Sequence, residues 1–285
     1  MPYTNPRYLL STAGLAAQLD DPALRILDCT VYITSEGVGG GLEHYEKAHI
    51  PGAVFADLAG ELSDPDSPLR FTMPSGARFA AAMSHYGVGT GTRVVCYDAN
   101  MSMWAARVWW MLRAFGFEDA AVLDGGWKKW KLEGRPSSTE QGSYPSATFV
   151  AHPRAGLIAT KDEVLAASRS GAGCVINALT EEQHRGDSGA TSYGRAGHIA
   201  NSTNVSARGM LDPETGAYLP AETLSRRFAD AGASQGGRVI TYCGGGIAAS
   251  SDALILTLLG HDDVAVYDGS LSEWARDASL PMEVG

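Results

Sequence analysis

Long apolar segments and basic clusters are absent from this sequence of 285 residues. It contains no run of 18 apolar residues, so we expect no transmembrane helix. Residues 1–6 lack the basic segment followed by an apolar one that marks a secretory signal, and none is expected. The formal net charge is −10 and the pI is about 5.1, which argues against nucleic acid or an anionic membrane as a partner.

Cysteine and histidine are present, but not in the patterns that bind metals. The seven histidines form neither His-Glu-x-x-His nor a Cys/His ligand spacing, so no metal site is expected. The four cysteines lie far apart without a Cys-x-x-Cys pair, and we expect reduced thiols in a cytoplasmic protein. Three of them, Cys29, Cys96 and Cys174, are expected to be buried or incidental.

The fourth cysteine, Cys243, stands between a predicted strand and a predicted helix. Residues 239–242 are mostly apolar or β-branched, three glycines follow the cysteine, and residues 248–259 carry apolar side chains at helical spacing. A thiol there lies at the positive end of a helix dipole, in a loop whose amides can turn inward. Such a cradle stabilises a sulfur anion. Its predicted members are Gly244, Gly245, Gly246, Ile247, Ala248 and Ala249.

The pattern of the first half of the chain returns in the second half. Strands alternate with helices in both copies, which predicts an α/β fold of two tandem domains, each a mostly parallel sheet flanked by helices. We expect the domains at residues 1–140 and 155–285, joined by a Ser-, Gly- and Pro-rich linker at 137–153. The corresponding stretches are 25–28 and 174–177, 49–53 and 198–202, 94–98 and 239–243, and 124–126 and 268–270.

The two copies differ at the position of Cys243. The first copy has Asp98 there, followed by Asn100, Met101 and Met103 in place of the glycines. Ligands bind at the carboxyl ends of parallel strands, where both residues are expected. A carboxylate cannot act as a sulfur nucleophile, so we expect a catalytic second domain and a catalytically inert first domain.

These features together resemble one known family. The paired His-Ile motifs and Asp-Gly turns, with the loop around Cys243 and Asp98 at the matching position, resemble the tandem-domain rhodaneses, the thiosulfate and 3-mercaptopyruvate sulfurtransferases. The resemblance implies two rhodanese-like domains, of which the second carries a persulfide on its loop cysteine. It also implies that arginines before the second His-Ile motif, here Arg185 and Arg195, hold an anionic donor.

The resemblance implies sulfur transfer that needs no cofactor. The Cys243 thiolate would take sulfur from thiosulfate or 3-mercaptopyruvate and pass it to cyanide or a thiol. Residues 244–249 lack the basic side chains of thiosulfate-type members. Compared with 3-mercaptopyruvate-type members, Gly245 replaces a hydroxyl residue, Ala248 a threonine and Phe71 a histidine. Both donors therefore stay open, with the glycine-rich loop favouring 3-mercaptopyruvate.

Two other functions also stay open. A cysteine-type phosphatase uses a similar strand, cysteine, loop and helix, but needs an arginine six positions after the cysteine, where this chain has Ala249. A non-enzymatic rhodanese-like module would bind a partner or relay sulfur without fast turnover. The missing basic and hydroxyl side chains of the loop are compatible with that alternative.

Overall fold

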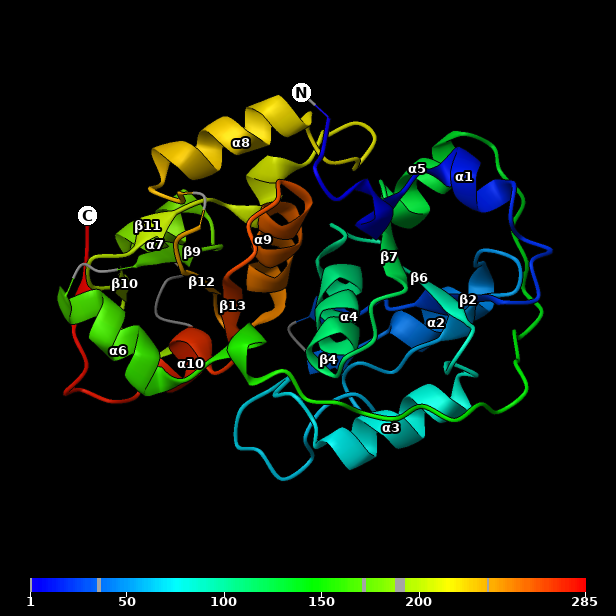
Figure 1. Cartoon of the computed structure of the whole chain (residues 1–285), viewed down its shortest axis with the longest axis horizontal. Coiled ribbons are helices and arrows are strands. Elements are labelled where there is room, and N and C mark those ends of the chain that lie inside the picture. The colour runs from blue at the N-terminus through cyan, green and yellow to red at the C-terminus, as the bar shows by residue number, and fades with distance from the viewer. Residues whose placement is uncertain (1, 35–36, 171–172, 188–192, 235) are drawn as a thin grey trace. The chain divides into compact units, whose positions relative to one another are not determined.

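The structure is a computed structural model that divides into two compact units (Figure 1). We call residues 7–154 with 212–218 the first domain, and residues 2–6 with 155–211 and 219–285 the second domain. Residues 2–6 thus belong to the second domain although they precede the first in the sequence, and residues 212–218 belong to the first domain although they lie within the second half of the chain. The predicted boundaries did not include these two segments. The structure describes residues 2–34, 37–170, 173–187, 193–234 and 236–285.

Each domain is built on a five-stranded parallel sheet, and the two sheets have equivalent strand orders, β1-β7-β6-β2-β5 and β8-β13-β12-β9-β11. The predicted fold class is thereby confirmed. The first sheet comprises β1 (Leu9–Leu10), β2 (Leu24–Asp28), β5 (Val54–Phe55), β6 (Arg93–Tyr97) and β7 (Ala120–Leu123). The second comprises β8 (Ile158–Ala159), β9 (Cys174–Asn177), β11 (Thr203–Asn204), β12 (Val239–Tyr242) and β13 (Val264–Tyr267).

The register of the two sheets reproduces the repeat residue by residue. In the first sheet Arg25 lies opposite Val94, and in the second Cys174 lies opposite Val239, as the repeat aligns them. The first residue after each central strand, β6 or β12, is therefore structurally equivalent in the two domains. In the second domain that residue is Cys243.

Helices flank both sheets (Figure 1). In the first domain they are α1 (Thr12–Ala16), α2 (Gly41–Lys47), α3 (Gly76–His85), α4 (Met103–Ala114) and α5 (Gly126–Leu132), with a hairpin of β3 (Tyr32–Thr34) and β4 (Gly37–Gly39). In the second they are α6 (Lys161–Ser170), α7 (Glu181–Arg185), α8 (Ala221–Asp230), α9 (Ile247–Leu258) and α10 (Ser270–Trp274), with the antiparallel pair β10 (His198–Ile199) and β14 (Met282–Glu283). Short 3₁₀ turns are η1 (Pro6–Tyr8), η2 (Ala155–Leu157) and η4 (Ala207–Met210).

The helices α4 and α9 follow the central strands and are buried along almost their whole length. The first packs on β6 and β7, and the second on β12 and β13. Their mostly apolar sequences match helices that have little solvent face. The sequence predicted the second of them at residues 248–259, within one residue of its observed bounds.

Residues 2–6 close the end of α9. The amides of Thr4 and Asn5 donate to Leu258 O at 2.9 and 3.1 Å, and Asn5 Nδ2 donates to Thr257 O at 2.9 Å. The last carbonyls of a helix have no intrahelical donor, so this distant segment satisfies them. The N-terminal strand residues that follow, from Leu9, belong to the first domain.

Residues 137–153, predicted as a linker, pack against the first domain. The Tyr144 hydroxyl accepts from Ile26 N at 3.1 Å and donates to Gly52 O at 2.8 Å. Phe149 is buried with its ring centroid 5.6 Å from that of Phe79. The segment therefore contributes to the compact unit that ends at residue 154.

Candidate active site

Cys243 is the first residue after β12, at the carboxyl edge of the second-domain sheet, and is only 2% exposed. Two amides of α10 anchor the loop that it begins. Leu271 N donates to Cys243 O at 3.0 Å, and Ser272 N donates to Gly244 O at 2.9 Å. The backbone that carries the thiol is therefore held between β12 and α9.

The loop after Cys243 contains amides that have no acceptor. In the described part of the chain, the amides of residues 244, 245 and 247–249 donate to no protein group. The first amides of a helix lack an intrahelical acceptor and favour a bound anion. Gly246, the N-cap of α9, has a left-handed φ of 77°, whereas Gly244 and Gly245 do not have positive φ. The loop thus offers the amides that the predicted cradle requires. Of its three glycines, only Gly246 has a backbone conformation that favours glycine.

Ser270, which the sequence did not single out, braces this loop. Its Oγ accepts from Cys243 N and Gly246 N, both at 3.1 Å, and donates to Tyr267 O at 2.7 Å. The residue has a left-handed φ of 48°, which costs a side chain with a Cβ about 1–2 kcal/mol. The equivalent Gly126 has a φ of 50°. The sequence feature that could have identified Ser270 is the difference between the two copies, which have glycine at 126 and serine at 270.

Asp98 fills the equivalent position of the first domain with its own carboxylate. Its Oδ1 accepts from the amides of Asn100 and Ser102 at 2.8 and 3.1 Å. Its Oδ2 accepts from those of Trp104 and Ala105 at 3.0 and 2.9 Å. Burial raises the pKa of Asp98 to about 6, although these hydrogen bonds oppose the shift. The amides at the start of α4 are thus occupied by the chain itself.

Replacing Asp98 by asparagine should change how stability depends on pH. Folding raises the pKa of Asp98 from 3.8 to about 6, so the native state binds more protons between these values and loses stability as the pH rises through them. This decrease in the free energy of unfolding is on the order of 3 kcal/mol, and it is absent from Asp98→Asn, whose side chain does not titrate. The variant should be less stable than wild type at pH 4, because its amide nitrogen faces N–H donors, and the difference should narrow toward pH 7.

Urea unfolding followed by tryptophan fluorescence measures this effect, because five of the six tryptophans lie in the first domain. Sulfur loading of Cys243 should be nearly unchanged in Asp98→Asn, as expected of an inert first domain. A stability difference that is constant from pH 4 to pH 7 would contradict the electrostatic argument. Loss of loading in a folded variant would show that the first domain takes part in the chemistry.

Arg185 ends α7, which begins shortly after β9 at the same sheet edge as Cys243. Its Nη1 donates to Glu181 Oε1 at 2.6 Å and its Nε to Asp187 Oδ2 at 3.1 Å. The side chain remains 40% exposed. Two carboxylates therefore offset the charge of this guanidinium, and its binding of an anionic donor stays a prediction.

Arg195 is engaged by four backbone carbonyls. Its Nε donates to Ala275 O at 3.1 Å and its Nη1 to Leu280 O at 2.9 Å. Its Nη2 donates to Trp274 O at 3.3 Å and Asp277 O at 2.7 Å. Four of the five guanidinium N–H donors are thus used around the end of α10, the helix that anchors the cysteine loop. These contacts indicate a structural role, and the predicted binding of a donor stays a prediction.

Arg195→Ala should therefore lower the free energy of unfolding of the second domain by roughly 2–4 kcal/mol, because four carbonyls lose a charged donor. Thermal unfolding measures the change. The exposed Arg276 provides a matched control, since Arg276→Ala should leave Tm unchanged. An unchanged Tm in Arg195→Ala, with only a raised KM for the donor, would reject the structural role.

Tyr193 lies directly against the cysteine loop. A Cβ built on Gly244 would lie 2.2 Å from Tyr193 Cζ and 2.3 Å from its hydroxyl oxygen. Burial raises the pKa of Tyr193 to about 12, and the charge of Cys243 adds to this shift. The sequence offered no signal for this residue, because nothing in a single chain links position 193 with position 244.

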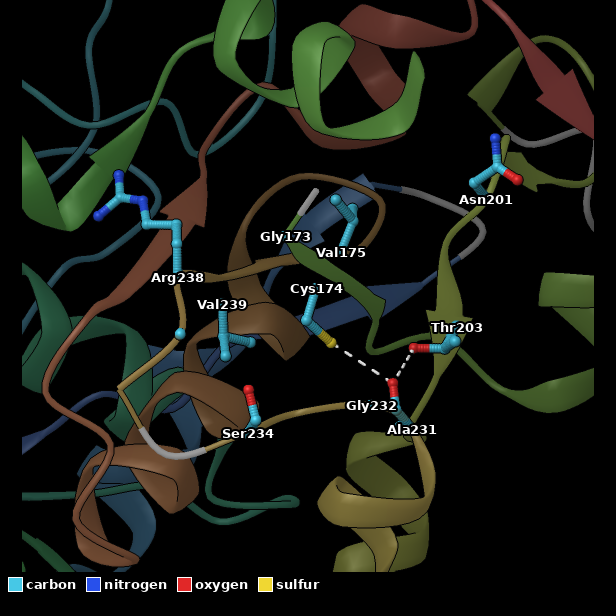
Figure 2. Close-up of a pocket in the computed structure, with 11 residues that line it drawn as sticks. Gly173, Cys174, Val175, Asn201, Thr203, Ala231, Gly232, Ser234, Arg238 and Val239 are labelled. Atoms are coloured by element: carbon cyan, nitrogen blue, oxygen red, sulfur yellow. Dashed lines mark hydrogen bonds between the residues drawn. The ribbon is translucent and has the colours of Figure 1, made fainter. Parts of the chain in front are cut away.

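A cavity of about 610 Å³ lies at the other edge of the second-domain sheet, near the amino ends of β9 and β12 (Figure 2). Cys174 lines it, with Sγ donating to Ala231 O at 3.4 Å (Figure 2), and burial raises the pKa of this thiol. A protonated thiol at the amino edge is poorly suited to nucleophilic attack. Cys29 and Cys96 are fully buried in the first domain.

Comparisons with known proteins match both domains. A family model described as "Rhodanese-like domain" matches residues 11–133 and 165–277. The thiosulfate sulfurtransferase of Rattus norvegicus is 35% identical over 281 residues, which cover 95% of this chain and 93% of the rat protein. The 3-mercaptopyruvate sulfurtransferase of Escherichia coli K12 is 32% identical over 270 residues, which cover 94% of this chain and 95% of the bacterial protein.

A solved structure agrees with these matches. The crystal structure of SseA from Escherichia coli, described as a 3-mercaptopyruvate sulfotransferase with the rhodanese fold, has a TM-score of 0.83 to this chain. The two share 29% sequence identity, and the match covers 92% of this chain and 98% of SseA.

Proposed function

The chain belongs to the rhodanese-like domain family, and on that premise we propose that it is a sulfurtransferase that carries sulfur as a persulfide on Cys243. The difference between its two loops carries the proposal. In the first domain, the Asp98 carboxylate accepts four amide hydrogen bonds at the start of α4. In the second domain, a thiol takes that position, and the amides of residues 244, 245 and 247–249 lack a protein acceptor within the described residues. This arrangement suits a sulfur anion carried by the cysteine.

In the first half-reaction, the Cys243 thiolate attacks the sulfur atom that the donor gives up. With thiosulfate, a new S–S bond forms while the donor S–S bond breaks, and sulfite leaves with the electron pair. With 3-mercaptopyruvate, the C–S bond breaks, its electron pair forms the enolate of pyruvate, and the carbon then takes the proton of the thiol. Both routes leave an anionic persulfide on Cys243, and both balance without an oxidant or reductant.

In the second half-reaction, cyanide or a thiol attacks the outer sulfur and the Cys243 thiolate leaves, so ping-pong kinetics are expected. The amides of residues 244, 245 and 247–249 stabilise the sulfur anion as preorganised dipoles. Ser270 positions that loop through its two accepted hydrogen bonds. Arg185 would hold the carboxylate or sulfonate of the donor.

The donor and the compartment belong to the proposal. Relatives are named for both donors. Residues 244–249 hold no cation, which favours the keto acid 3-mercaptopyruvate over the compact thiosulfate dianion.

We propose a cytoplasmic location, although one relative from Arabidopsis thaliana is named mitochondrial. Within the described residues, no helix is both long and apolar enough for a membrane span.

The test is intact-mass spectrometry of the wild-type protein after incubation with each donor. A persulfide adds one sulfur atom, about 32 Da, and a thiol acceptor should remove it. Loading followed by catalytic turnover supports the sulfurtransferase. Loading without turnover would support a sulfur-relay module, and no loading with either donor would reject the proposal. The phosphatase alternative lacks support, because Ala249 offers only a methyl group where a phosphoryl-binding arginine is needed.

A further inference from the structure

The hydroxyl end of Tyr193 occupies the space that a side chain at position 244 would fill. The atoms nearest a Cβ on Gly244 are Tyr193 Cζ, Oη and Cε1, at 2.2, 2.3 and 2.4 Å. Gly244 does not have positive φ, so its backbone conformation does not require glycine. The absence of a side chain is what the close approach of the phenol requires. The loop and the tyrosine are thus matched to each other.

The Tyr193 hydroxyl is available as a hydrogen-bond donor. Among the residues that the structure describes it has no hydrogen-bond partner, whereas the hydroxyls of Tyr242 and Tyr267 in the same domain bond to other side chains. The ring is half-buried and packs against the apolar core of the second domain, which limits its movement. The phenol is protonated at neutral pH, and burial raises its pKa still further above that range.

The loop around Cys243 lacks a free side-chain donor of its own. Residues 244–249 carry no hydroxyl, ammonium or guanidinium group. The Ser270 hydroxyl donates to Tyr267 O and accepts from the loop amides, so its proton is used. We propose that Tyr193 is a further catalytic residue, whose phenol donates a hydrogen bond to the anionic sulfur carried by Cys243. This role rests on the proposed function.

The hydrogen bond acts on charge and transfers no proton. Negative charge is present on the Cys243 thiolate and, after loading, on the outer sulfur of the persulfide. A neutral phenol stabilises these anions more than the neutral thiol. Thiosulfate and 3-mercaptopyruvate leave the same persulfide, so removing the hydroxyl should affect both donors by the same factor. Arg185, in contrast, would contact the sulfonate of thiosulfate or the carboxylate of 3-mercaptopyruvate, which are the groups in which the two donors differ.

The experiment compares Tyr193→Phe with wild type and with Tyr144→Phe, the loss of a hydroxyl from another half-buried tyrosine, in the first domain. The loaded fraction is measured by intact mass at a fixed ratio of thiosulfate to sulfite. We expect the loading equilibrium and kcat/KM for both donors to fall about tenfold in Tyr193→Phe. The pH midpoint for alkylation of the Cys243 peptide by iodoacetamide should rise by about one pH unit, the equivalent of tenfold. Tyr144→Phe should match wild type in all three measurements.

Gly244→Ala provides a second variant. Its Cβ displaces the end of the ring, so it should reproduce the loss of loading, and it should add little in a Tyr193→Phe background. Full additivity of the two substitutions, or wild-type loading and alkylation in Tyr193→Phe, would overturn the proposal. A loss confined to one donor would also overturn it. If wild type forms no adduct, the proposed function is wrong, and the alkylation midpoint still decides whether Tyr193 stabilises the Cys243 sulfur.

Discussion

Replacing Cys243 by serine should abolish sulfur loading and lower turnover with either donor by at least about a thousandfold. The serine hydroxyl is a weak nucleophile at neutral pH, and it cannot form a persulfide. The fold should be retained, because the thiol takes no part in the hydrogen bonds that hold the loop: the amides of Leu271 and Ser272 donate to it, and the Ser270 hydroxyl accepts from it. Intact mass after donor treatment, together with steady-state turnover, measures the effect.

The three other cysteines are the matched controls. Cys174→Ser removes a half-buried thiol of the same domain and should load normally. Cys29→Ser and Cys96→Ser should also load, but each places a hydroxyl at a fully buried position and should cost stability. An adduct of about 32 Da on Cys243→Ser, or wild-type turnover in that variant, would refute the mechanism.

Replacing Arg185 by alanine should lower kcat/KM for the preferred donor by about 10- to 150-fold, the value of one charge-assisted contact of roughly 1.5–3 kcal/mol. Discharge of a pre-formed persulfide to an acceptor should stay near normal, because the donor has already left. The carboxylates of Glu181 and Asp187 offset the charge of this guanidinium. Glu181→Gln should therefore raise kcat/KM for the anionic donor, in the direction opposite to Arg185→Ala.

The measurement is kcat/KM for thiosulfate and for 3-mercaptopyruvate with a common acceptor. Unchanged kinetics in Arg185→Ala would remove this residue from the site. A thiosulfate value well above the mercaptopyruvate value in wild type would reverse the preferred donor. High salt should reduce the effect of both substitutions, since the side chain is 40% exposed.

The duplicated fold could be predicted from the sequence because its signals are local. Apolar strands such as residues 239–242, each followed by a helical pattern, indicate a parallel α/β sheet. The alignment of the two copies placed Cys243 opposite Asp98, and the sheet registers agree with it. The role of Asp98 could not be predicted from its residue type. Four amides reach its carboxylate only because of how the chain turns into α4.

The sequence by itself determined the strand–cysteine–loop–helix at Cys243 and the equivalence of the two domains, since these depend on neighbours along the chain. Only the tertiary structure decided what surrounds the loop. The phenol of Tyr193 lies against Gly244, 51 positions further along the chain, and the hydroxyl of Ser270, the first residue of α10, accepts from Cys243 N and Gly246 N. The same packing directs Arg195 to four carbonyls near α10. Contacts of this kind arise when segments distant in sequence meet, and no local pattern of residue types encodes them.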